Sequence, residues 1–331
     1  MEQEALLSVR GLKTHFKTPE GTVKAIDGID FDLFSGETLG IVGESGSGKT
    51  MTSLSILGLL PKPQGNIVAG SILYGGKDLT KLSEREMRSL RGKEIAMIFQ
   101  EPMTSLNPVY TVEQQIIEAI QSHSAVNKQN AAAEVVRLLE KVGIPEAKRR
   151  SKSYPHELSG GMRQRVMIAM ALACNPKILI ADEPTTALDV TIQAQILELL
   201  TSLQKQLGMS IMIITHDMGV IADVATRVVV LYAGKVVETA STKELFANPL
   251  HPYTLGLLAC IPKIDEDKER LYSIPGMVPS PLELPAGCRF SNRCGFADET
   301  CRQNEPELRS FGNDHKAACR YVEKIQEGTI R

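Results

Sequence analysis

The chain has 331 residues, of which 43% are hydrophobic and 23% charged, and its formal net charge is −2 at pH 7. This composition is typical of a globular protein with an ample core, and the charge gives no sign of nucleic-acid binding. No apolar run approaches the roughly 18 residues of a membrane span, and the acidic start, Met1–Glu4, is not a secretory signal. We therefore expect a soluble, cytosolic chain that acts at a membrane only through other chains.

A glycine-rich loop follows a series of strand-like runs that occupy residues 6–42. The last of these runs, 38–42, predicts a buried strand, and residues 51–60 predict a helix that stops at Pro61. Between the two, the pattern G-x-x-x-x-G-K-[ST] is met at every fixed position by Gly43, Glu44, Ser45, Gly46, Ser47, Gly48, Lys49 and Thr50.

A strand, this loop and a helix in that order predict a phosphate-binding loop rather than a Gly/Ser-rich linker. The glycines let the backbone wrap round an anion, and N–H groups and the helix dipole then point at it. Lys49 would contact the β- and γ-phosphates, and the Thr50 hydroxyl would bind Mg²⁺. We therefore predict a nucleoside triphosphate site. Phe16, 27 residues before Gly43, is placed either to stack on the base or to fill the core.

The middle of the chain changes from strands to helices. A helix with a solvated face is expected at 83–92, and a buried strand at 94–99 ends at Gln100. From there to about residue 153 the pattern favours helices, of which 112–120 and 131–142 are the clearest. We interpret this part as a helical insertion within a helical subdomain of about residues 101–175.

A serine followed by two glycines opens the next helix, which we expect to run to about Cys174. Ser159 is a good N-cap residue, and Gly160 and Gly161 leave the N–H groups of the helix accessible to an anion. The remaining predicted elements are a helix at 192–207 and a hairpin at 228–238.

Polar side chains follow two buried strands. The apolar strand 177–181 delivers Asp182 and Glu183 at its carboxyl end, which is where ligands bind in α/β sheets. The apolar strand 210–214 leads to His216. These positions predict a catalytic group, and the alternative is a capping carboxylate pair with a surface histidine.

In this order the motifs resemble the nucleotide-binding subunits of ABC transporters, over about residues 6–250. The resemblance rests on residues 43–50, Gln100, Leu158–Met162, Asp182–Glu183, Ala187–Asp189 and His216. It implies an α/β fold, namely a P-loop NTPase domain of the ABC type with a mixed sheet core, an antiparallel β subdomain and a helical subdomain. That ATPase domain would span residues 1–255, and a small irregular Cys-rich C-terminal extension would span 256–331.

The resemblance also implies roles for individual residues. Asp182 would hold Mg²⁺ through water, with Thr50 and Gln100 completing the oxygen shell. Glu183 would act as the general base on the attacking water, and His216 would hold the γ-phosphate and orient Glu183.

By the same resemblance the protein would close as a head-to-tail dimer around two ATP molecules. Ser159, Gly160 and Gly161 would cap the nucleotide held by the opposing subunit, and Asp189 would lie at the dimer seam. Met162 stands where the family usually has Gln, and we expect little loss because the anion contacts come from Ser159 and the backbone.

Two further segments, Ile98–Pro108 and Asn248–Thr254, are similar to segments of the oligopeptide and dipeptide importer ATPases. This resemblance extends over essentially the whole chain and implies an ATP-hydrolysing subunit that energises peptide import. Its partners would be two integral-membrane permease subunits, a second homologous ATPase or a copy of itself, and indirectly an extracytoplasmic peptide-binding protein. Importers of nickel, opines or sugars, a non-transport ABC ATPase and a non-hydrolysing regulatory subunit are the alternatives.

Four of the six cysteines lie in the last 44 residues, at Cys288, Cys294, Cys301 and Cys319. In a cytosolic protein four clustered thiols favour one metal centre over disulfides. Zn²⁺ and an iron–sulfur cluster both accept four thiolates, and the spacings contain no C-x-x-C pair. The peptide-importer resemblance implies a [4Fe–4S] cluster. Zinc and the absence of any metal are the alternatives, and we expect a structural role for a bound centre.

Overall fold

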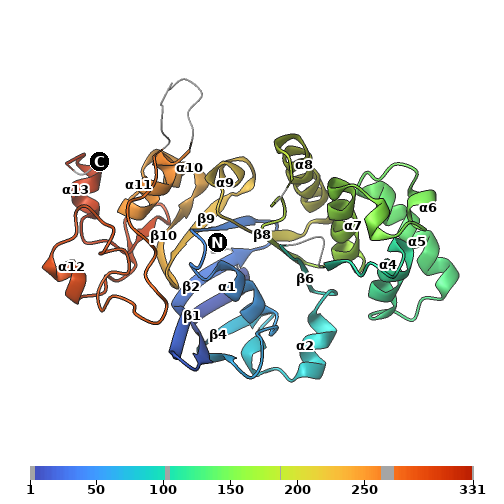
Figure 1. Cartoon of the computed structure of the whole chain (residues 1–331), viewed down its shortest axis with the longest axis horizontal. Helices are drawn as coiled ribbons and strands as arrows, with labels where there is room; N and C mark the ends of the chain where they lie inside the picture. The colour runs from blue at the N-terminus through green and yellow to red at the C-terminus, as the bar shows by residue number, and fades with distance from the viewer. Residues whose placement is uncertain (1–3, 101–104, 187, 262–271, 330–331) are drawn as a thin grey trace. The chain divides into compact units, whose positions relative to one another are not determined.

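A computed structural model describes residues 4–100, 105–186, 188–261 and 272–329 of the chain (Figure 1). Residues 101–104 of the predicted helical subdomain, Ala187, and the first part of the predicted extension at 262–271 lie outside the described residues. The chain forms two compact units, one made of residues 1–81 with 215–331 and the other of residues 82–214.

The first unit contains an antiparallel sheet with the strand order β2-β1-β4-β5. These strands are β1 (Ala5–Thr18), β2 (Gly21–Phe34), β4 (Gly65–Tyr74) and β5 (Lys77–Asp78). The strands predicted before residue 35 are confirmed. Strand β4 pairs with β1 from Gly65 onward.

A second sheet of the first unit leads into the glycine-rich loop. Its strand β3 (Thr38–Val42) is buried along its whole length and runs parallel to β9 (Arg227–Tyr232). The predicted hairpin is confirmed, since β9 pairs with β10 (Lys235–Ser241). Near the C-terminus, β12 (Lys316–Ala317) pairs with β10, and β11 (Arg309–Ser310) pairs with β12.

The α-helices described in the first unit are α1 (Lys49–Ile56), α9 (Met218–Val224), α10 (Thr242–Ala247), α11 (Pro252–Ala259), α12 (Glu299–Gln303) and α13 (Val322–Gln326). The prediction that α1 reaches residue 60 is wrong. Gly58 takes a left-handed conformation (φ 62°), and the Leu59 N–H donates to the Leu54 carbonyl at 2.8 Å. This is a glycine-terminated helix end, so Pro61 is not the stop signal.

The second unit contains parallel strands, β6 (Ile95–Ile98), β7 (Ile178–Asp182) and β8 (Ser210–Thr215), with β7 between the other two. Each begins and ends close to the residues predicted for it. In the β6–β7 pair Ile98 lies opposite Ala181, so the residues that follow the two strands emerge side by side.

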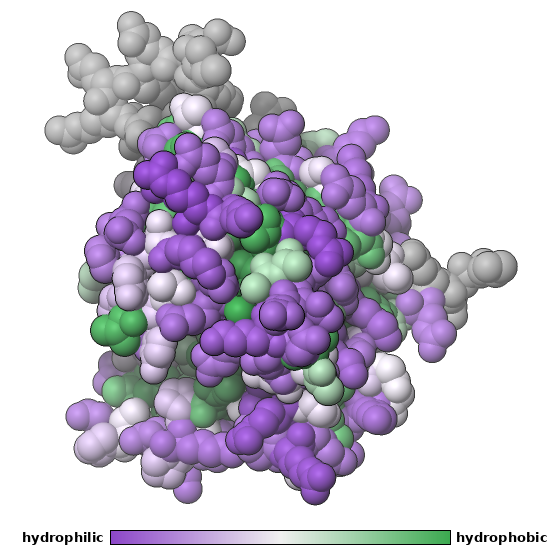
Figure 2. All heavy atoms as spheres, turned by 90° about the vertical axis from the view of Figure 1, so that its right-hand side faces the viewer, coloured by the Kyte–Doolittle hydropathy of each residue, from purple (hydrophilic) through white to green (hydrophobic). Residues whose placement is uncertain are grey.

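Helices account for most of the rest of this unit, as predicted. They are α2 (Glu84–Leu90), α4 (Val112–Gln121), α5 (Lys128–Lys141), α6 (Ala147–Arg150), α7 (Gly160–Leu172) and α8 (Val190–Leu207). In α5 the apolar side chains of Val135, Leu138 and Leu139 are buried. Figure 2 shows the side on which α4, α5 and α6 lie in Figure 1, where hydrophilic side chains predominate and apolar ones are scattered. In the described part of the chain, no helix combines the length and the hydrophobicity needed to cross a membrane.

Candidate functional site

The glycine-rich loop lies between β3 and α1, and two of its glycines are required by their surroundings. A Cβ atom on Gly43 would lie 2.1 Å from the Leu231 carbonyl oxygen of β9. Gly48 has φ 104°, and a Cβ there would lie 2.7 Å from the Ala25 carbonyl oxygen of β2. Any larger residue would therefore push the loop away from the strands that support it.

The loop presents the polar groups that a phosphate needs. Gly48 is the N-cap of α1 and provides no side-chain cap, so N–H groups of the first turn are directed into the loop. Lys49 is buried, and its Nζ donates to the carbonyls of Gly43 at 2.7 Å and Glu44 at 3.0 Å. The Ser47 N–H donates to the Glu44 carbonyl, which closes the turn. Thr50 follows directly, half-buried in the first turn of α1.

Phe16 lies on β1, where it pairs with Val23 of β2 and Gly65 of β4. It is half-buried, and a Cβ atom on Gly65 would lie 2.5 Å from the Phe16 ring. The ring therefore covers Gly65, a cross-strand arrangement that leaves part of the ring exposed.

The second unit brings Gln100, Asp182 and Glu183 together at the carboxyl ends of β6 and β7. Asp182 is the last residue of β7 and is 1% exposed. Two donors hold the Glu183 carboxylate, the Gln100 Nε2 at 2.9 Å and the Thr186 hydroxyl at 2.9 Å. This grouping of three predicted residues is observed directly.

The backbone at Glu183 is unusual for a residue with a side chain. Its φ is 45°, in the left-handed region, and its N–H donates to the Ile214 carbonyl of β8 at 2.8 Å. Such conformations cost about 1–3 kcal/mol and cluster at functional sites, where the surrounding structure enforces them. The conformation turns the chain sharply after the strand and places the carboxylate beside Gln100.

His216 follows β8 and is exposed, in the first unit. The next residue, Asp217, is the N-cap of α9, and its carboxylate accepts from the N–H of Gly219 at 2.7 Å. The Asp217 N–H donates to the Thr215 hydroxyl at 3.0 Å. His216 is thus flanked by two residues held by hydrogen bonds.

Two other predicted residues are N-caps of their helices. The Ser159 hydroxyl accepts from the Met162 N–H at 3.3 Å, which begins α7. The Asp189 carboxylate accepts from the Ile192 N–H at 2.9 Å, so α8 begins at Val190 rather than at the predicted Ile192. Gly160 follows Ser159 in the first turn of α7. A Cβ atom on Gly161 would lie 2.9 Å from Ile192, so glycine allows α7 and α8 to approach closely.

Sequence reasoning missed Gln164, on the buried side of α7. It is 1% exposed, and its Nε2 donates to the Pro184 carbonyl at 2.6 Å. This bond ties the helix that begins at Ser159 to the residue after Glu183. The position of a glutamine among the buried residues of α7 was the available signal.

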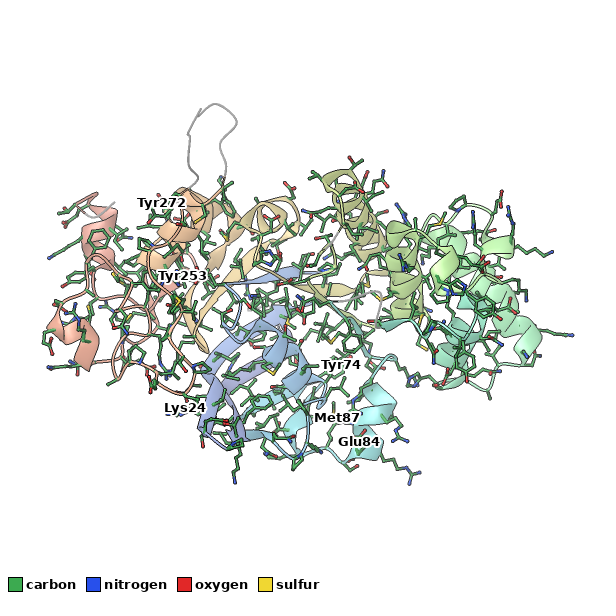
Figure 3. The ribbon with its side chains drawn as sticks, in the orientation of Figure 1. Lys24, Tyr74, Glu84, Met87, Tyr253 and Tyr272 are labelled. Carbon is green, nitrogen blue, oxygen red and sulfur yellow. The ribbon has the colours of Figure 1, made fainter. Side chains whose placement is uncertain are left out.

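Two residues of the C-terminal part also contact the glycine-rich loop and were missed. Tyr253 of α11 is fully buried, and its hydroxyl accepts from the Glu44 N–H at 2.8 Å (Figure 3). Burial raises the pKa of Tyr253 well above its usual range, so the hydroxyl stays protonated. Arg293 pairs with the Glu44 carboxylate through Nη1 at 2.5 Å and Nη2 at 3.1 Å. Position 293 directly precedes a cysteine already singled out, which was its only signal in the sequence.

The four clustered cysteines line one cavity of about 20 Å³, together with His251, Phe290 and Tyr321. Burial raises the pKa of Cys288 to about 11 and that of Cys319 to about 12. Cys288 and Cys301 are further joined by a backbone hydrogen bond of 2.8 Å. The four thiols thus share one small cavity.

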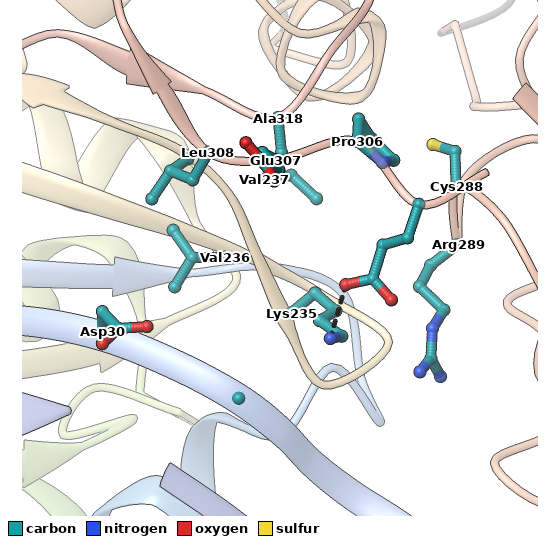
Figure 4. A pocket seen from close by; sticks show the side chains of 12 residues that line it. Asp30, Lys235, Val236, Val237, Cys288, Arg289, Pro306, Glu307, Leu308 and Ala318 are labelled. Carbon is teal, nitrogen blue, oxygen red and sulfur yellow. Dashed lines mark ion pairs between the residues drawn. The ribbon is translucent and has the colours of Figure 1, made fainter. Parts of the chain in front are cut away.

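The geometry of a metal centre is not assembled in the described residues. No group of three or more His, Cys, Asp or Glu side chains among them is arranged to hold a metal ion. A cavity of this size has room for about one water molecule. Cys288 and Arg289 also line a neighbouring pocket of about 380 Å³, where Lys235 pairs with Glu305 (Figure 4).

Comparison with known proteins agrees with this fold and loop. Residues 26–186 match the model of the ABC transporter family. A dimeric ATP-binding cassette solved in a post-hydrolysis state with ADP and Pi is similar to this chain with a TM-score of 0.63 and 29% identity, covering 71% of this chain and 98% of that one. The fold and the site define an ABC-type ATPase.

Residues 237–301 match the model of the C-terminal region of oligopeptide/dipeptide transporters. The oligopeptide transport ATP-binding protein AppD of Bacillus subtilis is 52% identical, over 95% of this chain and 96% of that protein. The dipeptide transport ATP-binding protein DppD of Escherichia coli is 50% identical, over 96% of this chain and 97% of that protein. The chain belongs to the oligopeptide/dipeptide family of ABC transporter ATP-binding proteins.

Proposed function

We propose that this protein hydrolyses ATP to energise the import of dipeptides or oligopeptides through an ABC transporter. The observation that carries the proposal is the match of residues 237–301 to the C-terminal region of oligopeptide/dipeptide transporters, on a chain with a complete phosphate-binding loop. Relatives about half identical over nearly the whole chain are named as dipeptide and oligopeptide transport ATP-binding proteins.

In the proposed ATP complex, residues 43–50 hold the phosphates and Phe16 stacks on the base. Thr50, Gln100 and Asp182 would supply oxygen ligands to Mg²⁺, which would neutralise phosphate charge. Glu183 would act as general base, supported by the two donors on its carboxylate. His216 would contact the γ-phosphate.

The proposed working unit is a head-to-tail dimer beneath two permease subunits, on the cytoplasmic side of the membrane. Ser159, Gly160 and Gly161 would cap the nucleotide of the opposing subunit, and Asp189 would lie at the seam. The second subunit is a copy of this chain or a homologous ATPase, and an extracytoplasmic binding protein would deliver the peptide.

We further propose that Cys288, Cys294, Cys301 and Cys319 hold a structural metal centre. The common cavity of the four thiols supports it. Four thiolates could hold either Zn²⁺ or a [4Fe–4S] cluster. Iron, sulfide and zinc analysis of protein purified without oxygen separates the two. Turnover that depends on redox state would overturn the structural role.

Co-purification from native cells in mild detergent, without oxygen, tests the transport function. We expect two polytopic membrane proteins and an ATPase partner to co-purify. In a second assay, uptake of radiolabelled peptides should be lost in cells that carry Lys49→Ala and restored by the wild-type gene. Uptake of nickel, opines or sugars in place of peptides would show that the proposed peptide cargo is wrong. Ribosomal or DNA-bound partners without any membrane protein would overturn transport while leaving the ATPase in place.

A further inference from the structure

Arg293 is built into the structure as a fixed contact to the phosphate-binding loop. Its side chain is 4% exposed, and the Glu44 carboxylate that it pairs with is 28% exposed. Each of its guanidinium nitrogens has an acceptor: Nε donates to the Pro275 carbonyl at 3.0 Å and Nη2 to the Ile274 carbonyl at 3.1 Å, beside the two bonds to Glu44. This geometry fixes the fork of the guanidinium in one orientation.

An aromatic cluster holds the same part of the chain against the loop. The rings of Tyr232 and Phe290 meet edge to face with centroids 5.2 Å apart, and those of Tyr253 and Phe290 lie 5.4 Å apart. The Arg293 guanidinium lies 5.8 Å from the centroid of each of the Tyr232 and Phe290 rings. Since Tyr253 also accepts the Glu44 N–H, the C-terminal part of the chain holds both the main chain and the side chain of Glu44.

Glu44 in turn contacts the residue that binds phosphate. Its carbonyl oxygen accepts from Lys49 Nζ and from the Ser47 N–H. Glu44 is also a negative charge on a loop that must bind a highly charged anion, and Arg293 balances that charge. Without Arg293, an unpaired carboxylate beside the loop would repel the phosphates.

We propose that Arg293 is a positioning residue for ATP binding, which fixes the loop through Glu44 and cancels the charge of that residue. The C-terminal extension is on this view a working part of the ATP site, in addition to any metal that it holds. The inference rests on ATP binding by this chain and does not depend on which cargo the transporter carries.

The test is equilibrium binding of a fluorescent ATP analogue, together with kcat and KM for ATP. Arg293→Ala is expected to weaken binding and raise KM about 10-fold or more, with kcat at saturating ATP changed less than about threefold. Arg302→Ala is the matched control, because Arg302 is exposed and follows Cys301, and it should bind like the wild type.

A second substitution separates charge from packing. If the unpaired Glu44 carboxylate causes the loss, Arg293→Ala combined with Glu44→Gln should recover affinity to within about threefold of wild type. Arg293→Lys, which keeps the charge without the fork, should fall between wild type and Arg293→Ala. Wild-type affinity in Arg293→Ala, or a double variant no better than that single variant, would overturn the proposal.

Two further measurements keep the test informative. If Arg293→Ala does not fold, hydrogen exchange in residues 43–50 is measured for Arg293→Lys, Glu44→Gln and the wild type. Exchange in Arg293→Lys is expected to be faster than in the wild type. Exchange identical to wild type there would count against the proposal. Failure of wild-type cells to take up peptides would remove the proposed cargo alone, because ATP binding is measured on the purified chain.

Discussion

The side-chain amide of Gln100 donates a 2.9 Å hydrogen bond to the carboxylate of Glu183. Both residues stand two positions beyond a paired position of neighbouring parallel strands, since Ile98 lies opposite Ala181. The register of the sheet therefore delivers the two side chains to one place. A change at the end of either strand would therefore alter the position of the Glu183 carboxylate, which is proposed to activate water.

Glu183→Gln is expected to lower kcat for ATP hydrolysis at least about 100-fold, because an amide does not accept the proton of the attacking water. ATP binding should persist, since the amide keeps the size of the side chain. Phosphate release and ATP-dependent dimerisation, followed by size-exclusion chromatography, measure the two effects.

Glu198→Gln on α8 is the control, because Glu198 is exposed and is not among the buried residues of its helix. It should hydrolyse ATP at the wild-type rate. Hydrolysis by Glu183→Gln at that same rate would show that Glu183 is not the base.

Gln100→Ala is expected to lower kcat about 10-fold, because it removes a hydrogen-bond donor to the Glu183 carboxylate. A hydrogen bond to a charged group contributes about 1.5–3 kcal/mol when well shielded, and this one is exposed, so the lower end applies. Steady-state kinetics with binding of an ATP analogue measure it. An unchanged kcat would mean that Thr186 alone suffices to orient the carboxylate.

Arg289→Ala is expected to destabilise the protein by about 2–3 kcal/mol. Arg289 Nη2 lies 2.7 Å from an oxygen of Asp27, and both side chains are nearly buried. Removing one partner of a buried pair costs about 3–5 kcal/mol, and Lys13, whose Nζ lies 3.7 Å from Asp27, reduces that cost.

Urea-induced unfolding of Arg289→Ala, Asp27→Ala and the double variant measures this pair. Coupling requires that the double variant lose less stability than the sum of the single variants. Strict additivity would show that the two residues act independently.

His251 is expected to make stability depend on pH. It is buried, and burial lowers its pKa to about 3, against about 6.5 in the unfolded chain. Its Nδ1 accepts the Tyr253 N–H at 3.0 Å, which requires the neutral ring. Between pH 6.5 and 3 the unfolded chain binds a proton that the folded chain does not, so the contribution present above pH 6.5 is lost as the pH falls, by up to about 1.4 kcal/mol per unit.

The comparison that isolates this effect is His251→Asn, which keeps an acceptor for the Tyr253 N–H and does not titrate. Between pH 7.5 and 5.5 the wild type should lose about 1 kcal/mol more unfolding free energy than His251→Asn. Parallel pH profiles for the two proteins would exclude His251 as the source.

Much of the nucleotide site could be predicted from local pattern. The glycine-rich loop, the strand before it and the helix after it follow from apolar runs and from glycines at positions that a Cβ atom would block. The same holds for Asp182 and Glu183 after an apolar strand, and for Ser159 as an N-cap. The early end of α1 differs from the prediction of a stop at Pro61, because Gly58 takes a left-handed conformation that ends the helix.

The class of this protein follows from its motifs, because each motif is a short stretch whose chemistry depends on neighbours along the chain. What holds the glycine-rich loop depends instead on long-range packing. Tyr253 and Arg293 reach Glu44 across separations of 209 and 249 residues. Contacts of that range depend on how strands and helices pack, which no local periodicity encodes. By its sequence position Arg293 is a residue beside a cysteine near the C-terminus, whereas in the fold it contacts Glu44 of the glycine-rich loop.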